Sequence, residues 1–444
     1  QDGSSVFGPD ERGTTYYRAA FAGRMAEENW RPFGFFTEFK PRVSQGTAGS
    51  RPSFNWRYET WSVGTAGPSK GQLGNRLLRP ELATEREYGL DMIIRDRFSI
   101  ELVVANTEVR DQLIPIPLPG VFGYSSQYQN AGTVRSNAYE ATFEAVMVNR
   151  PGLTWRTGLV MDHSKATLHD WPRTCYRTST FYRCEGESFS TMFGNRFLTG
   201  SADLQTHHGG RYAGFANQFQ VNDDGYLVPV GNANWSDGMA QGLWGTTVNI
   251  DGVNFQWGLP LIELDDAGVT ALSRIGDANA DLNLGWTNNL RWRGMQFFTL
   301  FDAKIGGDVY NGTRQWPYRD FISPDMVQVG KAEANVKPID YYNRLYNINQ
   351  INSAFVEDGS YVKLREMSLS YRFNQEQLQR ALGGFGMSNL SLELIGRNLL
   401  TFTNYSGDDP EVGSTGAGGA TENPFDDFGY PNFRTFTFGV SIEF

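Results

Sequence analysis

Four oxygen-bearing side chains alternate along one segment in a pattern that could bind calcium. Asp277, Asn279, Asp281 and Asn283 occupy every second position, and carboxylate and amide oxygens are the ligands that Ca²⁺ takes in protein loops. The segment lacks both the glycine that bends an EF-hand loop and its late bidentate glutamate. We therefore predict a turn that leads into a strand, and no metal site.

Two cysteines lie close together in a polar segment. Cys175 and Cys184 are nine positions apart, and a disulfide that closes a surface loop in an oxidising compartment fits this spacing. Two unpaired thiols are the alternative. A zinc site would need two further ligands, and none of the histidines stands at a suitable spacing. The histidines are His163, His169, His207 and His208.

Six aromatic residues fall in segments that we expect to be external loops. Aromatic faces can stack on sugar rings or hold peptide side chains, so this group is where we predict substrate contacts. Packing of large loops on one another is the alternative for each residue. The six are Trp235, Trp244, Trp257, Tyr310, Trp316 and Tyr318.

The sequence shows no catalytic constellation. Serine, histidine and aspartate occur without a nucleophile elbow, and no Walker phosphate loop is present. The paired carboxylates Asp223 and Asp224 stand in a turn-like run that ends at Gly225. We predict that the chain is not an enzyme and uses no cofactor.

The last ten residues alternate between apolar and polar side chains without error. One face carries Phe436, Phe438, Val440, Ile442 and Phe444, and the other carries Thr435, Thr437, Gly439, Ser441 and Glu443. This period predicts a strand with one face toward lipid. A soluble sandwich strand could alternate in the same way, but it would seldom end the chain on an exposed aromatic. The terminal Phe444 resembles the assembly signal of outer-membrane barrels.

Ten further segments predict strands in the same way, although two are less regular. The segment 294–305 has no clear polar side, and 360–373 changes phase between Leu364 and Met367, which predicts a β-bulge. The ten segments are 14–22, 33–44, 82–95, 97–110, 136–148, 152–162, 280–292, 294–305, 360–373 and 388–398.

Short and long connections alternate between these strands. Membrane barrels show this pattern because their periplasmic turns are short and their extracellular loops are long. We predict that 163–279 is a long extracellular loop and that Gln375 to Leu382 form a brief helix.

The strand number indicates how much of a barrel the chain contains. About eleven strands would leave Gln1 outside the cell if Phe444 ends in the periplasm, whereas a complete single-chain bacterial barrel has an even number. We therefore expect residues 1–444 to be the C-terminal portion of a transmembrane antiparallel β-barrel of about 22 strands, a plugged transporter class. The plug domain would lie outside this chain.

Seven charged residues would project into the lumen if the alternation holds. We expect them to form charge pairs that hold a wide barrel and its plug, and a permeation path is the alternative. They are Arg156, Arg291, Arg365, Arg397, Glu140, Glu144 and Glu393.

Composition agrees with an all-β membrane protein. The chain has 444 residues, of which 14% are aromatic and 50 are glycine, and its mean hydropathy is −0.43. A barrel keeps a low mean hydropathy because only alternate residues of each strand face lipid. No run approaches the roughly 18 apolar residues of a spanning helix. The net charge of −10 argues against a nucleic-acid partner.

Three segments near the C-terminus carry a specific resemblance to a known family. They are VEDGSYVKLR at 356–365 with LSY at 369–371, GRNLLTFTNYSG at 396–407 with DPE at 409–411, and YP at 430–431 with RTFTFG at 434–439. In this order they resemble motifs of SusC/RagA-type TonB-dependent outer-membrane transporters. IGD at 275–277, GGDVYN at 306–311 and QNAG at 129–132 also match.

The resemblance implies TonB-dependent active import of oligosaccharide or peptide nutrients by a multi-pass protein in the outer membrane of a Gram-negative bacterium. It implies four partners: a SusD-like surface lipoprotein, the TonB-ExbB-ExbD complex acting through the missing plug, the barrel assembly machinery and outer-membrane lipid. A passive porin or a surface adhesin anchored by the barrel is the alternative. The loop 163–279 departs from a minimal family member and does not indicate the substrate.

Overall fold

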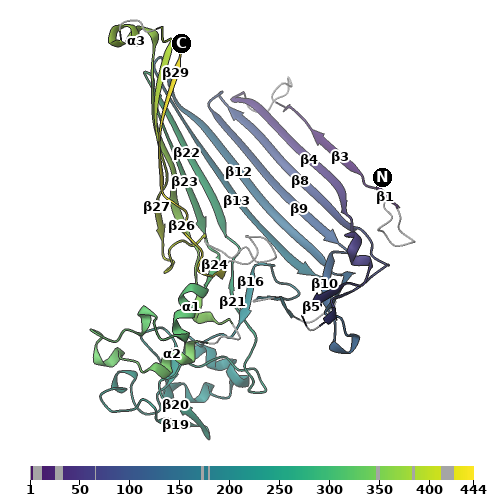
Figure 1. Cartoon of the computed structure of the whole chain (residues 1–444), viewed down its shortest axis with the longest axis vertical. Coiled ribbons are helices and arrows are strands. Elements are labelled where there is room, and N and C mark those ends of the chain that lie inside the picture. Colours follow the sequence, from purple (N-terminus) through teal and green to yellow (C-terminus); the bar gives the residue numbers. More distant parts are fainter. Residues whose placement is uncertain are drawn as a thin grey trace.

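The structure is a computed structural model dominated by one long, curved sheet with folded loops at one end (Figure 1). It describes residues 2–3, 13–25, 34–65, 67–171, 175–178, 181–346, 351–382, 386–411 and 425–444.

Eleven strands form the large sheet, and each pairs antiparallel with its neighbours in chain order. They are β3 (Arg18–Ala22), β4 (Phe36–Ser50), β8 (Glu81–Ile94), β9 (Phe98–Arg110), β12 (Thr133–Arg150), β13 (Leu153–His169), β22 (Leu282–Trp292), β23 (Met295–Ile305), β26 (Tyr361–Phe373), β27 (Asn389–Thr403) and β29 (Thr435–Glu443). Figure 1 shows the long strands side by side, and the strand order places β3 and β29 at the two edges. All eleven predicted strands are confirmed.

The alternation in the sequence separates the sheet into an apolar and a polar face. Phe297 lies opposite Leu369, which lies opposite Leu394 on the next strand, so apolar side chains continue across the strands. One residue further along, Gln296 lies opposite Ser370 on the other face. Successive side chains of a strand point to opposite faces of the sheet. Neighbouring residues along a strand therefore belong to the apolar and the polar face in turn.

The predicted irregularity of β26 is a β-bulge. The pairing of β26 with both neighbouring strands shifts between Leu364 and Glu366, which leaves Arg365 as the extra residue. On the β27 side, Asn398 has a positive φ of 52°. The bulge explains the change of phase in the sequence, because an extra residue moves the following side chains to the other face.

One end of the sheet is closed by tight turns. The β22–β23 turn contains Arg293 and Gly294 with φ values of 45° and 91°, and the β8–β9 turn contains Arg95 and Asp96 with φ values of 50° and 54°. Two central residues with positive φ match the right-handed twist of paired strands. These are the short links that the sequence predicts.

The connections at the other end are long and folded. The predicted boundary of the longest one needs correction, because β13 continues past Asp162 to His169, and the loop therefore begins later than residue 163. We call residues 170–281 and 306–360 the loop region. Figure 1 shows its elements α1, α2, β19 and β20 gathered beyond the ends of the long strands.

Short strands and helices make up these connections. The strands are β5 (Trp61–Gly64), β6 (Gly67–Lys70), β7 (Gln72–Leu73), β10 (Leu113–Pro117), β11 (Ser126–Asn130), β14 (Tyr176–Thr178), β15 (Phe181–Arg183), β16 (Thr191–Gly194), β17 (Phe219–Val221), β18 (Leu227–Pro229), β19 (Thr247–Ile250), β20 (Val253–Gln256), β21 (Ser273–Asp277), β24 (Asp308–Asn311), β25 (Val356–Asp358) and β28 (Phe425–Asp426), with β1 (Asp2–Gly3) and β2 (Gly13–Thr14) near the N-terminus.

Three α-helices are present in the described part of the chain: α1 (Gly312–Arg319), α2 (Ile339–Leu345) and α3 (Gln375–Leu382). The last of them is the helix that the sequence predicts. Within the described ranges, no helix has both the length and the apolar character needed to cross a membrane.

The largest buried core lies in the loop region and not in the large sheet. It is rich in aromatic residues, and Tyr310, Tyr341 and Phe355 are almost completely buried there. A second core packs around Leu204 and Tyr212 in the same region. The loops are therefore a folded structure with fixed surfaces.

Candidate functional site

A network of ion pairs covers the polar face near the N-terminal edge of the sheet. The Arg42 guanidinium on β4 lies 3.2 Å from Asp91 and 2.7 Å from Glu101, and it also pairs with Glu87. Lys40 reaches Asp91 at 3.0 Å. Charges from three neighbouring strands therefore neutralise one another along this face.

The polar face near the C-terminal edge of the sheet carries several of the residues that we predicted to face the lumen. Arg397 forms a 2.8 Å ion pair with Glu366, and the Arg365 Nε donates to Asp302 at 2.7 Å. In the register of the sheet, Glu393 lies opposite Ser370 on the same face.

Arg156, Glu140 and Glu144 also lie on the polar face, as their pairing register shows. Apolar residues also occur on that side, among them Val160 opposite Thr142 and Val146 opposite Arg156. The alternation assigned the seven charged residues to a common face correctly.

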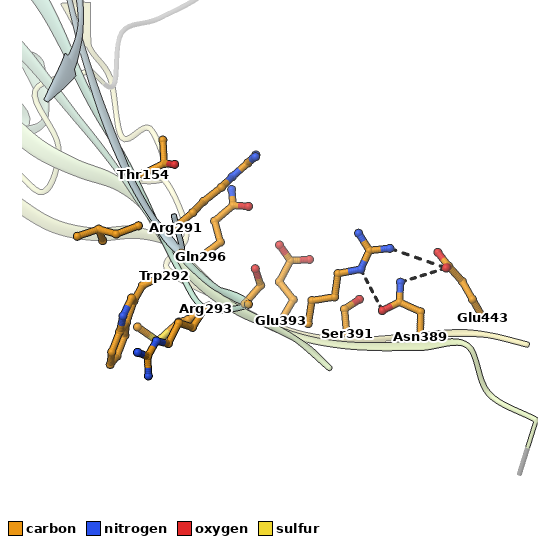
Figure 2. A pocket seen from close by; sticks show the side chains of 15 residues that line it. Thr154, Arg291, Trp292, Arg293, Gln296, Asn389, Ser391, Glu393 and Glu443 are labelled. Carbon is orange, nitrogen blue, oxygen red and sulfur yellow. Dashed lines mark hydrogen bonds and ion pairs between the residues drawn. The ribbon is translucent and has the colours of Figure 1, made fainter. Parts of the chain in front are cut away.

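A pocket of about 690 Å³ opens on the polar face at the end with the tight turns (Figure 2). Figure 2 shows Arg291, Gln296 and Glu393 on one side of the ribbon, while Trp292 points to the other. Among the described residues, Arg291 and Glu393 form no ion pair with any partner. This pocket thus presents a free cation and a free anion.

Further polar contacts border this pocket beside the C-terminal strand. The Arg372 Nε donates to Asn389 at 3.0 Å, and the Asn389 amide donates to Glu443 at 3.0 Å. Figure 2 marks both hydrogen bonds. They connect β26, β27 and β29 at their turn ends.

At the opposite end of β26, two cations hold the connection that follows β27. The Lys363 ammonium, almost fully buried, lies 2.5 Å from both Asp409 and Glu411. Glu411 also accepts from Arg365 and, at 3.0 Å, from the Tyr361 hydroxyl. Burial by itself would raise the pKa of Glu411, but the bonds from Arg365 and Lys363 outweigh it and lower the pKa to about 2.

Four of the six aromatic residues predicted to contact substrate are buried in the loop region. They are Trp235, Trp257, Tyr310 and Tyr318, with exposed fractions of 8% or less. They pack in the core, which is the alternative that the sequence left open, and their contact with substrate stays a prediction.

The tryptophans of this group pack against one another. Trp235 and Trp257 are stacked 5.7 Å apart, and Trp244 meets the edge of each at 5.3 and 5.1 Å. Trp244 and Trp316 are partly exposed, and Arg319 lies 5.0 Å from the Trp316 ring. These two remain candidates for substrate contact.

The structure joins Cys175 and Cys184 in a disulfide, with Cα atoms 4.3 Å apart. Asp277, the first residue of the calcium-like pattern, is held by protein groups: its carboxylate accepts from Ser188 at 3.1 Å and from Ser190 at 2.5 Å. It also pairs with Lys165 at 3.4 Å. Within the described ranges, no cluster of histidine, cysteine or acidic residues is arranged to hold a metal ion.

Sequence comparison places the chain beside TonB-dependent receptors. Its full length matches TonB-dependent receptor P3 of Formosa agariphila at 26% identity and TonB-dependent receptor P39 of the same bacterium at 25% identity. The matched regions are 43% and 44% of those receptors, so the chain spans less than half of their length. No protein-family model matches the chain.

Among solved structures, the RagAB peptide importer has a similar fold. The match to its open-open state covers 99% of this chain and 44% of that chain, with a TM-score of 0.68 and 16% identity. The closed-closed state matches with the same TM-score and 17% identity. At this identity the likeness concerns the fold alone.

The comparisons confirm the resemblance to TonB-dependent transporters that the C-terminal motifs suggest. The eleven-stranded sheet has the fold of the matching part of the RagAB peptide importer. The predicted outer-membrane location agrees with the similarity to TonB-dependent receptors. The relatives are receptors and importers, which supports the prediction that the chain is not an enzyme.

Proposed function

We propose that this chain forms part of the barrel of a TonB-dependent transporter that imports oligosaccharide or peptide nutrients across the outer membrane. The observation that carries the proposal is the opposed chemistry of the two faces of the sheet. Phe297, Leu369 and Leu394 continue one another on the apolar face, while Arg42 and Arg365 organise ion pairs on the polar face. Such a sheet can face lipid on one side and a polar lumen on the other.

Import through such a barrel needs a gate and a source of energy. A barrel of roughly 22 strands is wide enough to leak solutes unless its lumen is plugged. No ATP is available at the outer membrane to drive transport. In our proposal the TonB-ExbB-ExbD complex supplies the energy by moving the plug. The free Arg291 and Glu393 (Figure 2) are the wall residues that we assign to plug contact.

A surface lipoprotein of the SusD type is the proposed extracellular partner. After α1, the loop region exposes Phe321, Ile322, Val327 and Val329, the last with 92% of its surface accessible. Exposed apolar side chains concentrated in one segment mark interaction sites. The RagAB peptide importer has a similar fold. The lipoprotein partner of this chain is our own proposal.

Conductance across a planar lipid bilayer tests the gated barrel. The full-length protein should insert without forming an open ion channel, because its plug fills the lumen. Large stepwise conductance in the absence of any other protein would support the passive porin and contradict the importer.

Affinity purification from the native membrane in mild detergent tests the partner. We expect a SusD-like lipoprotein to be recovered with the full-length protein, and the double substitution Ile322→Asp and Val329→Asp to reduce its recovery. Val121→Asp provides a matched control, because Val121 is equally exposed on a different connection. Equal recovery with all three proteins would contradict the assigned surface.

A further inference from the structure

A second pocket, of about 540 Å³, opens on the apolar face of the large sheet, near the loop ends of β8, β9 and β12. Figure 1 shows these three strands side by side. Its lining residue Arg86 shares a face with Leu90, because residues an even number of positions apart on a strand point the same way. Leu90 lies opposite Leu102 on β9. A charged pocket thus lies on the face that we assign to lipid.

The pairing register places this pocket directly beyond two exposed tyrosines. Tyr88 on β8 and Tyr139 on β12 both lie opposite Val104, and each is about half exposed. Two residues closer to the loops, Arg86 lies opposite Asn106 on the same face. A step of two residues is about 7 Å along a strand. The apolar part of this face therefore ends at the tyrosines, and the cations begin one step beyond them.

Three arginines and one carboxylate line the pocket. Glu108 on β9 lies 3.0 Å from Arg135 on β12 and also pairs with Arg110. Arg86 donates to the Gln45 amide oxygen at 3.1 Å, and it has no carboxylate partner among the residues that the structure describes. Positive charge is therefore in excess here, in a chain whose net charge is −10. The pocket is suited to an anion.

The position of these arginines relative to the tyrosines sets the depth at which they meet a membrane. Aromatic girdles of membrane barrels lie at the two interfaces between hydrocarbon and water. An arginine on the lipid face is costly at the bilayer midplane and is tolerated near an interface. One step beyond the tyrosines, the arginines would lie at the level of the lipid headgroups. A guanidinium binds phosphate there with two parallel hydrogen bonds.

We infer that this pocket binds the phosphate of a phosphorylated lipid headgroup in the outer leaflet of the membrane. The inference rests on the proposed barrel and its orientation. The phosphate would lie between Arg86 and Arg135, and the acyl chains would lie along the apolar part of the face at Leu102. The Tyr17 hydroxyl also lines the pocket and accepts from Gln45 at 2.7 Å, so its own proton can be donated to the headgroup.

The position of the pocket favours a lipid over an acidic protein. Its arginines continue the same face as Leu90 and Tyr88, and in a barrel this face is surrounded by lipid. An acidic soluble protein would have to displace lipid headgroups to reach them. A phosphorylated lipid already has its anion at this depth and its apolar chains beside the leucines, so it complements both parts of the face.

Lipid binding to the full-length protein in detergent tests the inference. The probes are phosphorylated lipid A, the same lipid A after enzymatic removal of its phosphates, and inorganic phosphate. Native mass spectrometry during a titration counts the bound lipid molecules and gives the affinity. The test variant combines Arg86→Gln with Arg135→Gln. The control combines Arg76→Gln with Arg434→Gln, which removes the same charge from exposed arginines outside the pocket.

We expect phosphorylated lipid A to bind about 25-fold more weakly to the test variant, because each cation near an anionic surface contributes roughly fivefold. The control should bind as the unchanged protein does. Arg86→Lys with Arg135→Lys keeps both charges but not the paired hydrogen bonds of guanidinium. This lysine variant should bind several-fold more weakly than the unchanged protein, and it provides the test if the glutamine variant does not fold.

Four results would overturn the inference. The folded test variant could bind phosphorylated lipid A as tightly as the unchanged protein, or lipid A without phosphates could bind equally well. Inorganic phosphate could displace the lipid at equal concentration, which would indicate a site for a free anion. An acidic protein, and not lipid, could be lost from the purified test variant. TonB-dependent uptake would survive each of these results, so failure of the lipid site and failure of the import proposal are distinguishable.

Discussion

Glu411 is the residue on which the connection after β27 depends. Two cations of β26, Lys363 and Arg365, converge on its carboxylate. Lys363 is almost fully buried, so removing a partner would leave its charge poorly compensated. This carboxylate therefore fixes the connection to the end of the barrel wall.

Replacing Glu411 with Gln should loosen this connection at neutral pH. We expect the free energy of local opening to fall by about 2 kcal/mol, as for a hydrogen bond to a charged group. Faster amide hydrogen exchange in 404–411 would report it. Glu376→Gln is the control, because Glu376 and its partner Arg380 are both exposed.

The effect of Glu411→Gln should depend on pH in a defined direction. The pKa of Glu411 is lowered from 4.5 to about 2 in the folded protein. A carboxyl group whose pKa is lower in the folded than in the unfolded protein stabilises the fold at pH values above its unfolded-state pKa. This stabilisation is lost as the pH falls toward the folded-state pKa. The two proteins should differ fully at pH 7, and the difference should shrink as the pH falls from 4.5 toward 2. A difference that is undiminished at pH 2 would contradict this account.

Trp257 is predicted to stabilise the loop region by packing. We expect Trp257→Ala to lower its stability by about 3–5 kcal/mol, the usual cost of deleting a buried tryptophan. Limited proteolysis in increasing urea should then cut the loop region earlier than the barrel strands. Trp61→Ala should not have this effect, because Trp61 is more than half exposed.

The individual contact residues of the loops were the hardest to predict. An aromatic residue in a predicted loop can pack in the core of the loop or contact a ligand. The sequence does not distinguish these two roles, because both favour the same side chains. A pocket within the loop region was missed for another reason. Its lining residues Asp224 and Arg314 lie far apart in the chain and border one pocket only after the loops fold.

At the scale of the elements, the strands were predictable and the loop interiors were not. Alternation identifies a strand directly, because it records which face each side chain meets. Even the bulge at Arg365 left a visible change of phase. The C-terminal part of β13, residues 163–169, was not predicted because it lies beyond the regular alternation of apolar and polar residues.

The tight turn of Arg293 and Gly294 should be needed for assembly of the sheet. Gly294 has a φ of 91°, and a β-carbon there would lie 2.8 Å from the Arg372 carbonyl oxygen. We expect Gly294→Ala to reduce the folded fraction of the full-length protein, measured by heat-modifiable mobility on gels. Gly285→Ala, in β22, should fold normally because nothing lies within 4 Å of the added carbon. Equal folding of both variants would contradict a requirement for this turn.

At the scale of the whole molecule, the two faces of the sheet should differ in their tolerance of charge. Leu369 and Ser370 are neighbours on β26 that face opposite sides. We expect Leu369→Arg to cost about 2–4 kcal/mol if it lies near the membrane midplane. Ser370→Arg should be tolerated, because Glu393 lies opposite on the polar face. Unfolding in urea from lipid vesicles would measure both, and equal costs would contradict the assignment of the faces.

Uptake by living cells tests the central claim most directly. Cells that express the full-length protein would be given a labelled neutral oligosaccharide and a labelled peptide, with and without functional TonB. Our account predicts that uptake of at least one probe requires the transporter gene and falls to the level of gene-deleted cells when TonB is removed. Uptake that requires the gene but continues at the same rate without TonB would identify a passive porin and contradict active import.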